Sequence, residues 1–274
     1  MAERQATVAA VRVPELIALA ERMADESGDI LRRYFRRDLR FDDKPDSTPV
    51  TAADREVEKT LRRMIEAAYP DHGIVGEEFG AVREDAETVW VLDPIDGTGG
   101  FVTGKPLFGT LIGCVQKGLP VAGIIDHPAL RERWVGGEGS PATFNGNRVR
   151  VRPCARISDA MLYATTPHMF VGADAYAFDA LCDAVKRPQY GADCYAYGLL
   201  ASGFVDLVVE ASMKPCDYCA LAPVVAAAGG IMTDWEGRPL GLNSDGRVIA
   251  AGDERIHARA LKILAVGRDF GGLG

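Results

Sequence analysis

The segment Trp90-Val91-Leu92-Asp93-Pro94-Ile95-Asp96-Gly97-Thr98 decides how the rest of the chain is interpreted. Its apolar beginning is typical of a buried strand, and it ends in two carboxylates three residues apart within a turn-forming sequence. Because Asp caps free N–H groups and Pro suits the first helical position, we expect a helix to begin at Asp93-Pro94. Two oxygen ligands beside a helix N-terminus suit a divalent cation and a phosphate. The alternative is a solvated turn without a ligand.

Two further acidic motifs lie far from this segment along the chain. Gly76-Glu77-Glu78 precedes it, and Asp217 follows it, ahead of an Ala-rich run that ends in Gly229-Gly230. In this order the motifs resemble the inositol monophosphatase superfamily of magnesium-dependent, lithium-sensitive phosphatases, over nearly the whole chain. The resemblance implies an α/β protein built as a layered α/β/α/β/α sandwich. It also implies a homodimer and a small phosphorylated substrate.

Four other segments are similar to the histidinol-phosphate phosphatase branch of that superfamily. They are Lys105–Ile112, Thr166–Phe170, Tyr190–Tyr197 and Asp206–Glu210. This likeness implies hydrolysis of L-histidinol phosphate in histidine biosynthesis. The rival activities are those of a myo-inositol monophosphatase or a broad sugar-phosphate phosphatase. A protein that binds metal and phosphate without catalysis is a rival of another class, and a water-activating pair would be of no use to it.

The resemblance assigns roles to individual residues. Magnesium, as two or three ions that Mn²⁺ can replace, is expected to bind Glu77, Asp93, the Ile95 carbonyl, Asp96 and Asp217. Such ions neutralise charge and lower the pKa of the attacking water, so that Glu77 takes part in catalysis through its metal.

The remaining roles concern the water and the substrate. Asp54 and the Thr98 hydroxyl are expected to pair and to orient and deprotonate the attacking water. The Gly97 and Thr98 amides are expected to hold the phosphate. Asp193 and Glu210, outside the metal motif, are expected to bind the cationic end of histidinol phosphate, because an ammonium and an imidazole favour carboxylate partners.

The chain departs from the histidinol-phosphate phosphatase branch at two places. Gly99-Gly100 stand where that branch usually has a basic residue and a serine, and each Gly weakens a helix start by up to about 1 kcal/mol. Cys216 replaces the aromatic residue that ordinarily precedes the late aspartate, which puts the orientation of Asp217 in question. His168 lies in a segment similar to the branch, but it lacks neighbours at ligand spacing and we expect it to be structural.

The composition is that of a globular protein. The 274 residues are 47% hydrophobic and 26% charged, and the net charge of −8 argues against a protein that binds DNA or RNA. The apolar runs are far shorter than the ~20 residues of a membrane span, and the N-terminus lacks the apolar core of a secretory signal. We therefore expect a cytoplasmic protein that does not contact membranes. Its six cysteines are expected to be reduced core residues, because the Cys216–Cys219 pair has no second pair of zinc ligands.

Residues 1–150 are expected to form helices on a largely antiparallel sheet. Apolar spacing predicts helices over 14–37 and 51–69, the second capped by Thr51, and Asp54 suits a capping carboxylate as well as a catalytic one. A polar loop over 42–50 could cover a site as a lid. A strand over 72–76 leads to Glu77 and Glu78, of which only one can face the site, and the family pattern favours Glu77. Strands over 107–115 and 119–126 predict a hairpin, and 131–135 extends the sheet.

Residues 151–274 are expected to form a second α/β half, which carries the last metal ligand and the substrate-recognition residues. Helices are predicted over 173–185, 193–202, 220–228 and 254–266, and strands over 206–210 and 247–251. In this assignment Asp193 begins a helix, and capping that helix is its alternative role. The helix over 220–228 consists mainly of Ala and Val, which are small enough to pack closely on a sheet.

Overall fold

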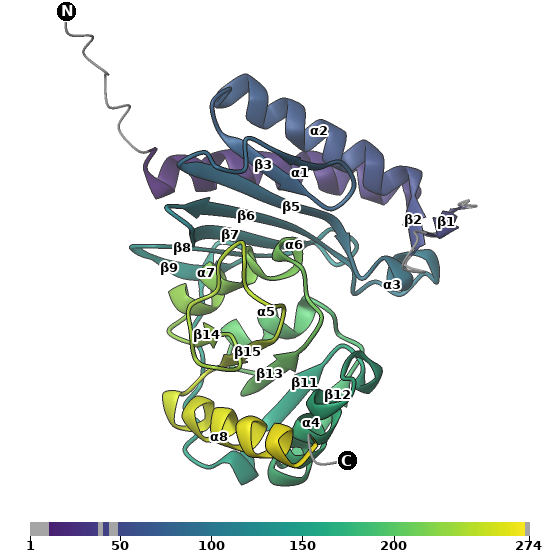
Figure 1. Cartoon of the computed structure of the whole chain (residues 1–274). Helices are drawn as coiled ribbons and strands as arrows, with labels where there is room; N and C mark the ends of the chain where they lie inside the picture. Colours follow the sequence, from purple (N-terminus) through teal and green to yellow (C-terminus); the bar gives the residue numbers. More distant parts are fainter. Residues whose placement is uncertain (1–10, 38–40, 44–48, 272–274) are drawn as a thin grey trace, which may run out of the picture.

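The computed structural model describes residues 11–37, 41–43 and 49–271 and contains two large β-sheets (Figure 1). The first sheet has eight strands, in the spatial order β10 (Asn147–Arg148), β9 (Ser140–Phe144), β8 (Glu132–Gly137), β7 (Leu119–His127), β6 (Gly109–Gln116), β5 (Thr88–Asp96), β3 (Gly73–Gly76) and β4 (Gly80–Val82). All neighbouring pairs are antiparallel except β3 and β5, which run parallel. The largely antiparallel first sheet is confirmed.

The second sheet is mixed and lies below the first in Figure 1. Its five strands follow the spatial order β12 (Arg187–Tyr190), β11 (Met161–Ala164), β13 (Leu207–Glu210), β15 (Val248–Ala251) and β14 (Ile231–Thr233). Strand β11 runs parallel to both of its neighbours, whereas β13 and β15 are antiparallel. A separate small hairpin joins β1 (Phe41–Asp43) to β2 (Pro49–Thr51).

Helices form three layers around these sheets (Figure 1). The outer face of the first sheet is covered by α1 (Val13–Tyr34) and α2 (Ala52–Ala68). The space between the sheets holds α5 (Tyr195–Ala201), α6 (Pro215–Tyr218) and α7 (Leu221–Ala227). The outer face of the second sheet is covered by α4 (Ala173–Ala184) and α8 (Glu254–Gly271). Separate hydrophobic clusters join these layers, which confirms the predicted α/β/α/β/α sandwich.

Glycines in the first sheet allow the segment before α7 to lie directly on the strands. A Cβ at Gly123 would stand 1.9 Å from the Ala220 carbonyl oxygen, and one at Gly113 would stand 2.9 Å from the Ala220 nitrogen. Since backbone atoms cannot yield as a flexible side chain can, only Gly permits this approach. The close packing predicted for the Ala-rich helix is confirmed, because a Cβ at Gly136 would stand 2.5 Å from Val224 Cα in that helix. Asp217 lies three residues before Ala220 in the chain.

The segment around Asp93 differs from the helix start that the sequence predicts. Strand β5 continues to Asp96, and its register with β6 shifts between Asp93 and Asp96. Pro94 lies in this bulge, where a missing N–H costs no ladder bond, and its carbonyl accepts a hydrogen bond from Thr110 Oγ1 at 2.9 Å. The helix α3 (Thr98–Val102) begins only after Gly97. The predicted helix start is therefore wrong.

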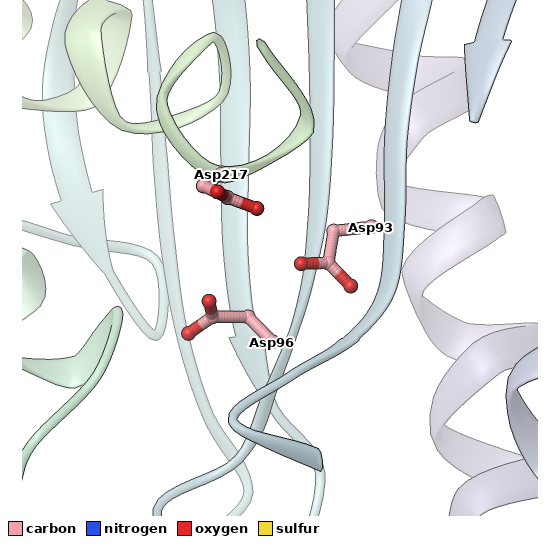
Figure 2. Close-up of side chains that lie close together, drawn as sticks. All are labelled: Asp93, Asp96 and Asp217. Carbon is pink, nitrogen blue, oxygen red and sulfur yellow. The ribbon is translucent and has the colours of Figure 1, made fainter. Parts of the chain in front are cut away.

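The bulge has a direct consequence for the site. Residues three apart on a regular strand point to opposite faces, because side chains alternate with a period of two. The extra length between Asp93 and Asp96 turns both carboxylates to the same side of β5 (Figure 2).

Other sequence expectations are corrected only in part. The loop predicted over 42–50 has paired ends, since Asp42 faces Val50 across the β1–β2 hairpin, and residues 44–48 lie outside the described residues. All six cysteines are free, and five are buried as expected, whereas Cys182 is half-buried. The boundary near residue 150 stays a prediction. Among the described helices, none combines the length and the apolar character needed to cross a membrane.

Candidate active site

Three carboxylates from distant parts of the chain converge between the two sheets (Figure 2). Asp93 and Asp96 extend from β5, and Asp217 extends from α6. One oxygen from each lies within 4.8 Å of the others, and Asp93 is only 2% exposed. An all-oxygen donor set at this spacing fits a hard divalent cation such as Mg²⁺.

Backbone N–H groups orient each of these carboxylates. Asp93 Oδ1 accepts from the Ile95 amide at 3.0 Å, and Asp96 Oδ2 accepts from the Cys194 amide at 2.8 Å. Asp217 Oδ2 accepts from the Lys214 amide at 2.6 Å, as the third residue of a short helix that begins with Pro215. Backbone amides therefore fix the orientation of all three carboxylates, from within the same segment for Asp93 and Asp217 and from the distant Cys194 for Asp96.

Cys216 supports Asp217 even though it replaces an aromatic residue. Its side chain is buried, and its thiol donates to Asp217 Oδ1 at 3.3 Å. Asp217 thus lies within the acidic cluster despite the sequence departure.

The electrostatics of the cluster are unfavourable without a counter-charge. Burial, then the charges of Glu77, Asp96 and Asp217, raises the pKa of Asp93 well above its usual range. Burial likewise raises the pKa of Asp217 to about 6. Carboxylates that resist ionisation for these reasons are stabilised in their charged form by a bound cation.

Glu77 faces the same site from the turn after β3. It lines a cavity of about 240 Å³ together with Asp93, Asp96 and Asp217. Lys214 Nζ lies 3.7 Å from Glu77 Oε1. The neighbouring Glu78 acts instead on Asp54, whose pKa its charge helps to raise. The structure thus places Glu77 with the cluster, as predicted.

Asp54 serves as the capping carboxylate of α2. Its Oδ2 accepts from the Thr51 amide at 2.8 Å and from the Thr51 hydroxyl at 2.7 Å. Its Oδ1 is buried and has no hydrogen-bond partner among the described residues. Asp54 does not line the cavity, but its charge helps to raise the pKa of Asp93. Burial raises the pKa of Asp54 to about 6. An unpartnered buried oxygen is suited to an additional ligand such as a water molecule.

The predicted pairing of Thr98 with Asp54 is not the one that the structure has. Thr98 Oγ1 donates to the Ile95 carbonyl at 2.9 Å, and the hydroxyl that binds Asp54 is that of Thr51. Local geometry explains the difference, because the capping box brings Thr51 and Asp54 together within one helical turn. Thr98 and the Ile95 carbonyl nevertheless line the cavity with the acidic cluster.

The cavity lining also carries one well-bonded carboxyl group outside the acidic cluster. Glu210, at the end of β13, accepts from the Thr165 amide at 2.9 Å and from the Tyr197 hydroxyl at 2.9 Å. The residue is 3% exposed, and burial raises its pKa to about 7. Tyr197 and Thr165 are not predicted from the sequence as partners of Glu210, although both lie in or beside segments that resemble the family.

Asp193 lies in the same cavity, and its predicted role as a helix start is wrong. Its φ is 49°, and α5 begins only at Tyr195, so Asp193 belongs to the turn before the helix. Its carboxylate lies 3.5 Å from Lys105 Nζ. A Cβ at Gly97 would stand 3.3 Å from Asp193 Cγ, which shows how closely the turn approaches the end of β5.

The remaining predicted positions divide between the cavity and the surface. Gly97, with a φ of 78°, and Gly99 line the cavity, whereas His168 is exposed in a short 3₁₀ turn and is not among its lining residues. Met169, next to His168, does line it and was not singled out from the sequence.

Known proteins match this chain over most of its length. The model of the inositol monophosphatase family matches residues 13–266. The bifunctional phosphatase IMPL2 of Arabidopsis thaliana, a chloroplastic protein, is 47% identical over 256 residues, which cover 90% of this chain and 74% of that protein. A histidinol-phosphatase of Chlorobaculum parvum is 36% identical over 237 residues, which cover 85% of this chain and 91% of that protein.

A solved structure gives the same assignment. The inositol monophosphatase from Zymomonas mobilis superposes with a TM-score of 0.86 at 45% identity, covering 93% of this chain and 99% of that one. The predicted resemblance is therefore confirmed, including its likeness to histidinol-phosphatases. The chain belongs to the inositol monophosphatase family of metal-dependent phosphatases and is a phosphoric monoester hydrolase.

Proposed function

We propose that this enzyme hydrolyses L-histidinol phosphate to L-histidinol and phosphate with Mg²⁺. The observation that carries this proposal is the pairing of two unlike walls in one cavity: the acidic cluster around Asp93 forms the first, and Glu210 with its two hydrogen-bond donors forms the second. The first wall suits a metal and a phosphate, and the second suits a cationic group. A histidinol-phosphatase at 36% identity supports the same substrate.

The metal would be held by oxygen atoms of Glu77, Asp93, Ile95, Asp96 and Asp217, as two or three ions that Mn²⁺ can replace. When bound, it supplies charge neutralisation and lowers the pKa of a coordinated water. The carboxylates contribute by being fixed in place before the ion arrives, since backbone amides orient Asp93, Asp96 and Asp217. Preorganisation of this kind avoids reorganisation cost during the reaction.

The water would be positioned between α2 and α3. Asp54 Oδ1, which is buried and unpartnered, is able to accept a proton or a hydrogen bond from it. The pKa of about 6 suits a general base near neutral pH. Thr98, bonded to the Ile95 carbonyl, would guide the water from the other side. The Gly97 and Thr98 amides, at the start of α3, would hold the phosphate.

Glu210 would bind the ammonium or imidazolium group of the substrate. A buried carboxyl group with a pKa of about 7 ionises more readily when a cation approaches. Asp193 would take a smaller share, because Lys105 already offsets its charge.

A panel of phosphate esters tests this assignment. We expect Glu210→Gln and Asp193→Asn each to cost about 1–3 kcal/mol in kcat/KM for histidinol phosphate, with Glu210→Gln at the upper end. Esters without a cationic group should lose much less, and they serve as the matched control. Equal losses for all esters, or a preference of the unmutated enzyme for inositol 1-phosphate, would contradict the histidinol assignment.

The second candidate activity is that of an inositol monophosphatase or a broad sugar-phosphate phosphatase, and the similarity to the Zymomonas mobilis inositol monophosphatase favours it. Within the proposal, the enzyme is a cytoplasmic homodimer, although one relative is a chloroplastic protein. A protein that only binds metal and phosphate would leave every ester of the panel intact.

A further inference from the structure

Glu58 is a buried acid that the proposed chemistry does not use. It lies on α2, one helical turn after Asp54, and its side chain has no solvent exposure. A carboxylate in such a place is costly unless hydrogen bonds satisfy it. Its partners therefore indicate what it is for.

Those partners belong to the turn that carries Glu77. Glu58 Oε2 accepts from the Glu78 amide at 2.7 Å, and Oε1 accepts from the Phe79 amide at 3.2 Å. The third donor is Arg62 Nε at 2.8 Å, and Arg62 also donates to the Gly80 carbonyl. The Glu58–Arg62 pair on α2 thus holds the last two residues of the turn and the first residue of β4.

The Glu77 amide is held from the other direction. It donates to the Leu92 carbonyl of β5 at 3.2 Å. Three successive amides of a hairpin turn are therefore bonded, the first to the strand that carries Asp93 and the next two to the helix that carries Asp54. Turns of this type are usually the mobile part of a sheet, so this one is unusually constrained.

Gly76 leaves the space that the Glu58 carboxylate occupies beside the turn. A Cβ at this position would stand 2.0 Å from Glu58 Oε1 and 2.8 Å from an Arg62 terminal nitrogen. Any side chain here would push the carboxylate away from the turn. The Gly before Glu77 is therefore required by the position of Glu58.

We propose that Glu58 is a positioning residue that fixes Glu77 in the geometry needed to bind the metal, an inference that rests on the metal role of Glu77 in the proposed function. Glu58 does not contact the reacting groups. It fixes the turn to α2 through hydrogen bonds, so that Glu77 and Asp54 keep fixed positions relative to Asp93. Partners that orient metal ligands in this way are typically worth 10–100-fold in metal affinity.

The first test compares Mn²⁺ binding by the full chain and its variants, measured by calorimetry without substrate. Glu58→Gln keeps the size of the side chain but provides one carbonyl acceptor in place of two carboxylate oxygens. We expect its Mn²⁺ affinity to fall about tenfold and the amides of residues 77–80 to exchange hydrogen faster. At saturating metal its kcat should recover, because the ligand itself is intact. Unchanged Mn²⁺ affinity in a folded Glu58→Gln protein would overturn the inference.

Two further variants separate positioning from general destabilisation. Leu61→Val alters the buried face of the same helix without touching the turn, and it should lower thermal stability while leaving Mn²⁺ affinity unchanged. Gly76→Ala removes no functional group, yet it should reproduce the Mn²⁺ defect by displacing the Glu58 carboxylate. The double variant Glu58→Gln/Gly76→Ala should then bind Mn²⁺ no more weakly than either single variant, because both substitutions break the same contact. Normal Mn²⁺ affinity in Gly76→Ala, or a defect in Leu61→Val, would contradict positioning.

Glu77→Gln distinguishes the failure of this inference from the failure of the proposed function. If Glu77→Gln weakens Mn²⁺ binding and Glu58→Gln does not, Glu77 is a ligand and the positioning role of Glu58 is wrong. If Glu77→Gln leaves Mn²⁺ binding intact, the assignment of Glu77 as a ligand fails, and the inference about Glu58 fails with it.

Discussion

The two walls of the cavity hold their carboxylates in opposite ways. Around Asp93, burial and neighbouring negative charges disfavour ionisation, and the carboxylate oxygens face one another. Around Glu210, a backbone amide and a tyrosine hydroxyl each donate to one of the two oxygens. The first wall has several acids whose charged forms need a bound cation. The second has one acid whose two oxygens already accept hydrogen bonds.

This difference indicates that the two walls bind different kinds of ligand. A cluster of like charges is stabilised by a multivalent ion, because a single side-chain cation cannot contact all its oxygens. An isolated carboxyl group with two donors is rigid and responds to one cationic group of a ligand. The two walls are therefore expected to respond differently to mutation, to pH and to metal removal.

The largest effect is expected at the centre of the acidic wall. Asp93→Asn should lower kcat roughly 10³-fold, because a metal ligand and its charge are lost together. In EDTA the same variant should be more heat-stable than the unmutated protein, since Asn, unlike Asp, needs no proton to stay neutral beside Glu77, Asp96 and Asp217. Phosphate release at saturating Mg²⁺ and thermal unfolding in EDTA measure the two effects. Full activity of the unmutated enzyme in EDTA would contradict the metal requirement on which this prediction depends.

The next effect concerns the pH dependence of stability at the second wall, which Glu210 forms. Burial raises the pKa of Glu210 from its ordinary 4.5 to about 7, so between these values the native state keeps a proton that the unfolded chain has released. The native state then binds more protons, and the free energy of unfolding falls as pH rises through this interval, by up to about 3 kcal/mol from this residue.

Glu210→Gln isolates that contribution. Its free energy of unfolding, measured with urea in EDTA between pH 4.5 and 7.5, should fall less steeply than that of the unmutated protein. The pH dependence that both proteins keep comes from other buried acids, such as Asp54, whose pKa is raised to about 6. Parallel pH curves for the two proteins would show that Glu210 titrates normally in the native state.

A smaller effect is expected for Thr98, which lines the cavity and is bonded to the Ile95 carbonyl. Thr98→Ala should lower kcat about 10–100-fold and change KM little, because the hydroxyl is expected to act on the attacking water rather than on substrate binding. Thr98→Ser restores the hydroxyl and should restore most of the rate. Steady-state kinetics at saturating Mg²⁺ separate the two constants. A change confined to KM would make Thr98 a substrate-binding residue.

The two walls also differ in how far the sequence predicts them. Asp93, Asp96 and Asp217 come from motifs whose order matches the family, and the structure brings their carboxylates together. The local geometry was harder to predict, because Pro94 after Asp93 looks the same in a bulged strand as at the first position of a helix. Only the pairing of β5 with β6 distinguishes the two.

Long-range hydrogen bonds limit what can be predicted. The Tyr197 hydroxyl reaches Glu210 across the space between α5 and β13, and no spacing in the sequence encodes that contact. Glu58 did leave a signal, because it shares the inward face of α2 with Leu61 and Ile65, where a charged residue is exceptional. The capping box at Thr51 was also visible, and it accounts for the partner that Asp54 takes.

The smallest effect is expected at the glycines of the cavity lining. Gly99 has an ordinary φ, and a Cβ there would meet no atom within 4 Å, so the structure has room for a side chain. Gly99→Ala should therefore stabilise the protein by about 0.5 kcal/mol, by restricting the unfolded chain, and should leave kcat/KM within about twofold.

Gly97→Ala is the matched control two residues earlier. Gly97 has a φ of 78°, and its added Cβ would stand 3.3 Å from Asp193 Cγ, so this variant should lose about 1–2 kcal/mol of stability from backbone strain. Thermal unfolding of both variants, with and without Mg²⁺, compares the two positions directly. If Gly99→Ala destabilises as much as Gly97→Ala, the open space beside Gly99 is not available to a side chain. The shape of this site would then explain why Gly99 stands where the histidinol-phosphate phosphatase branch usually has a basic residue.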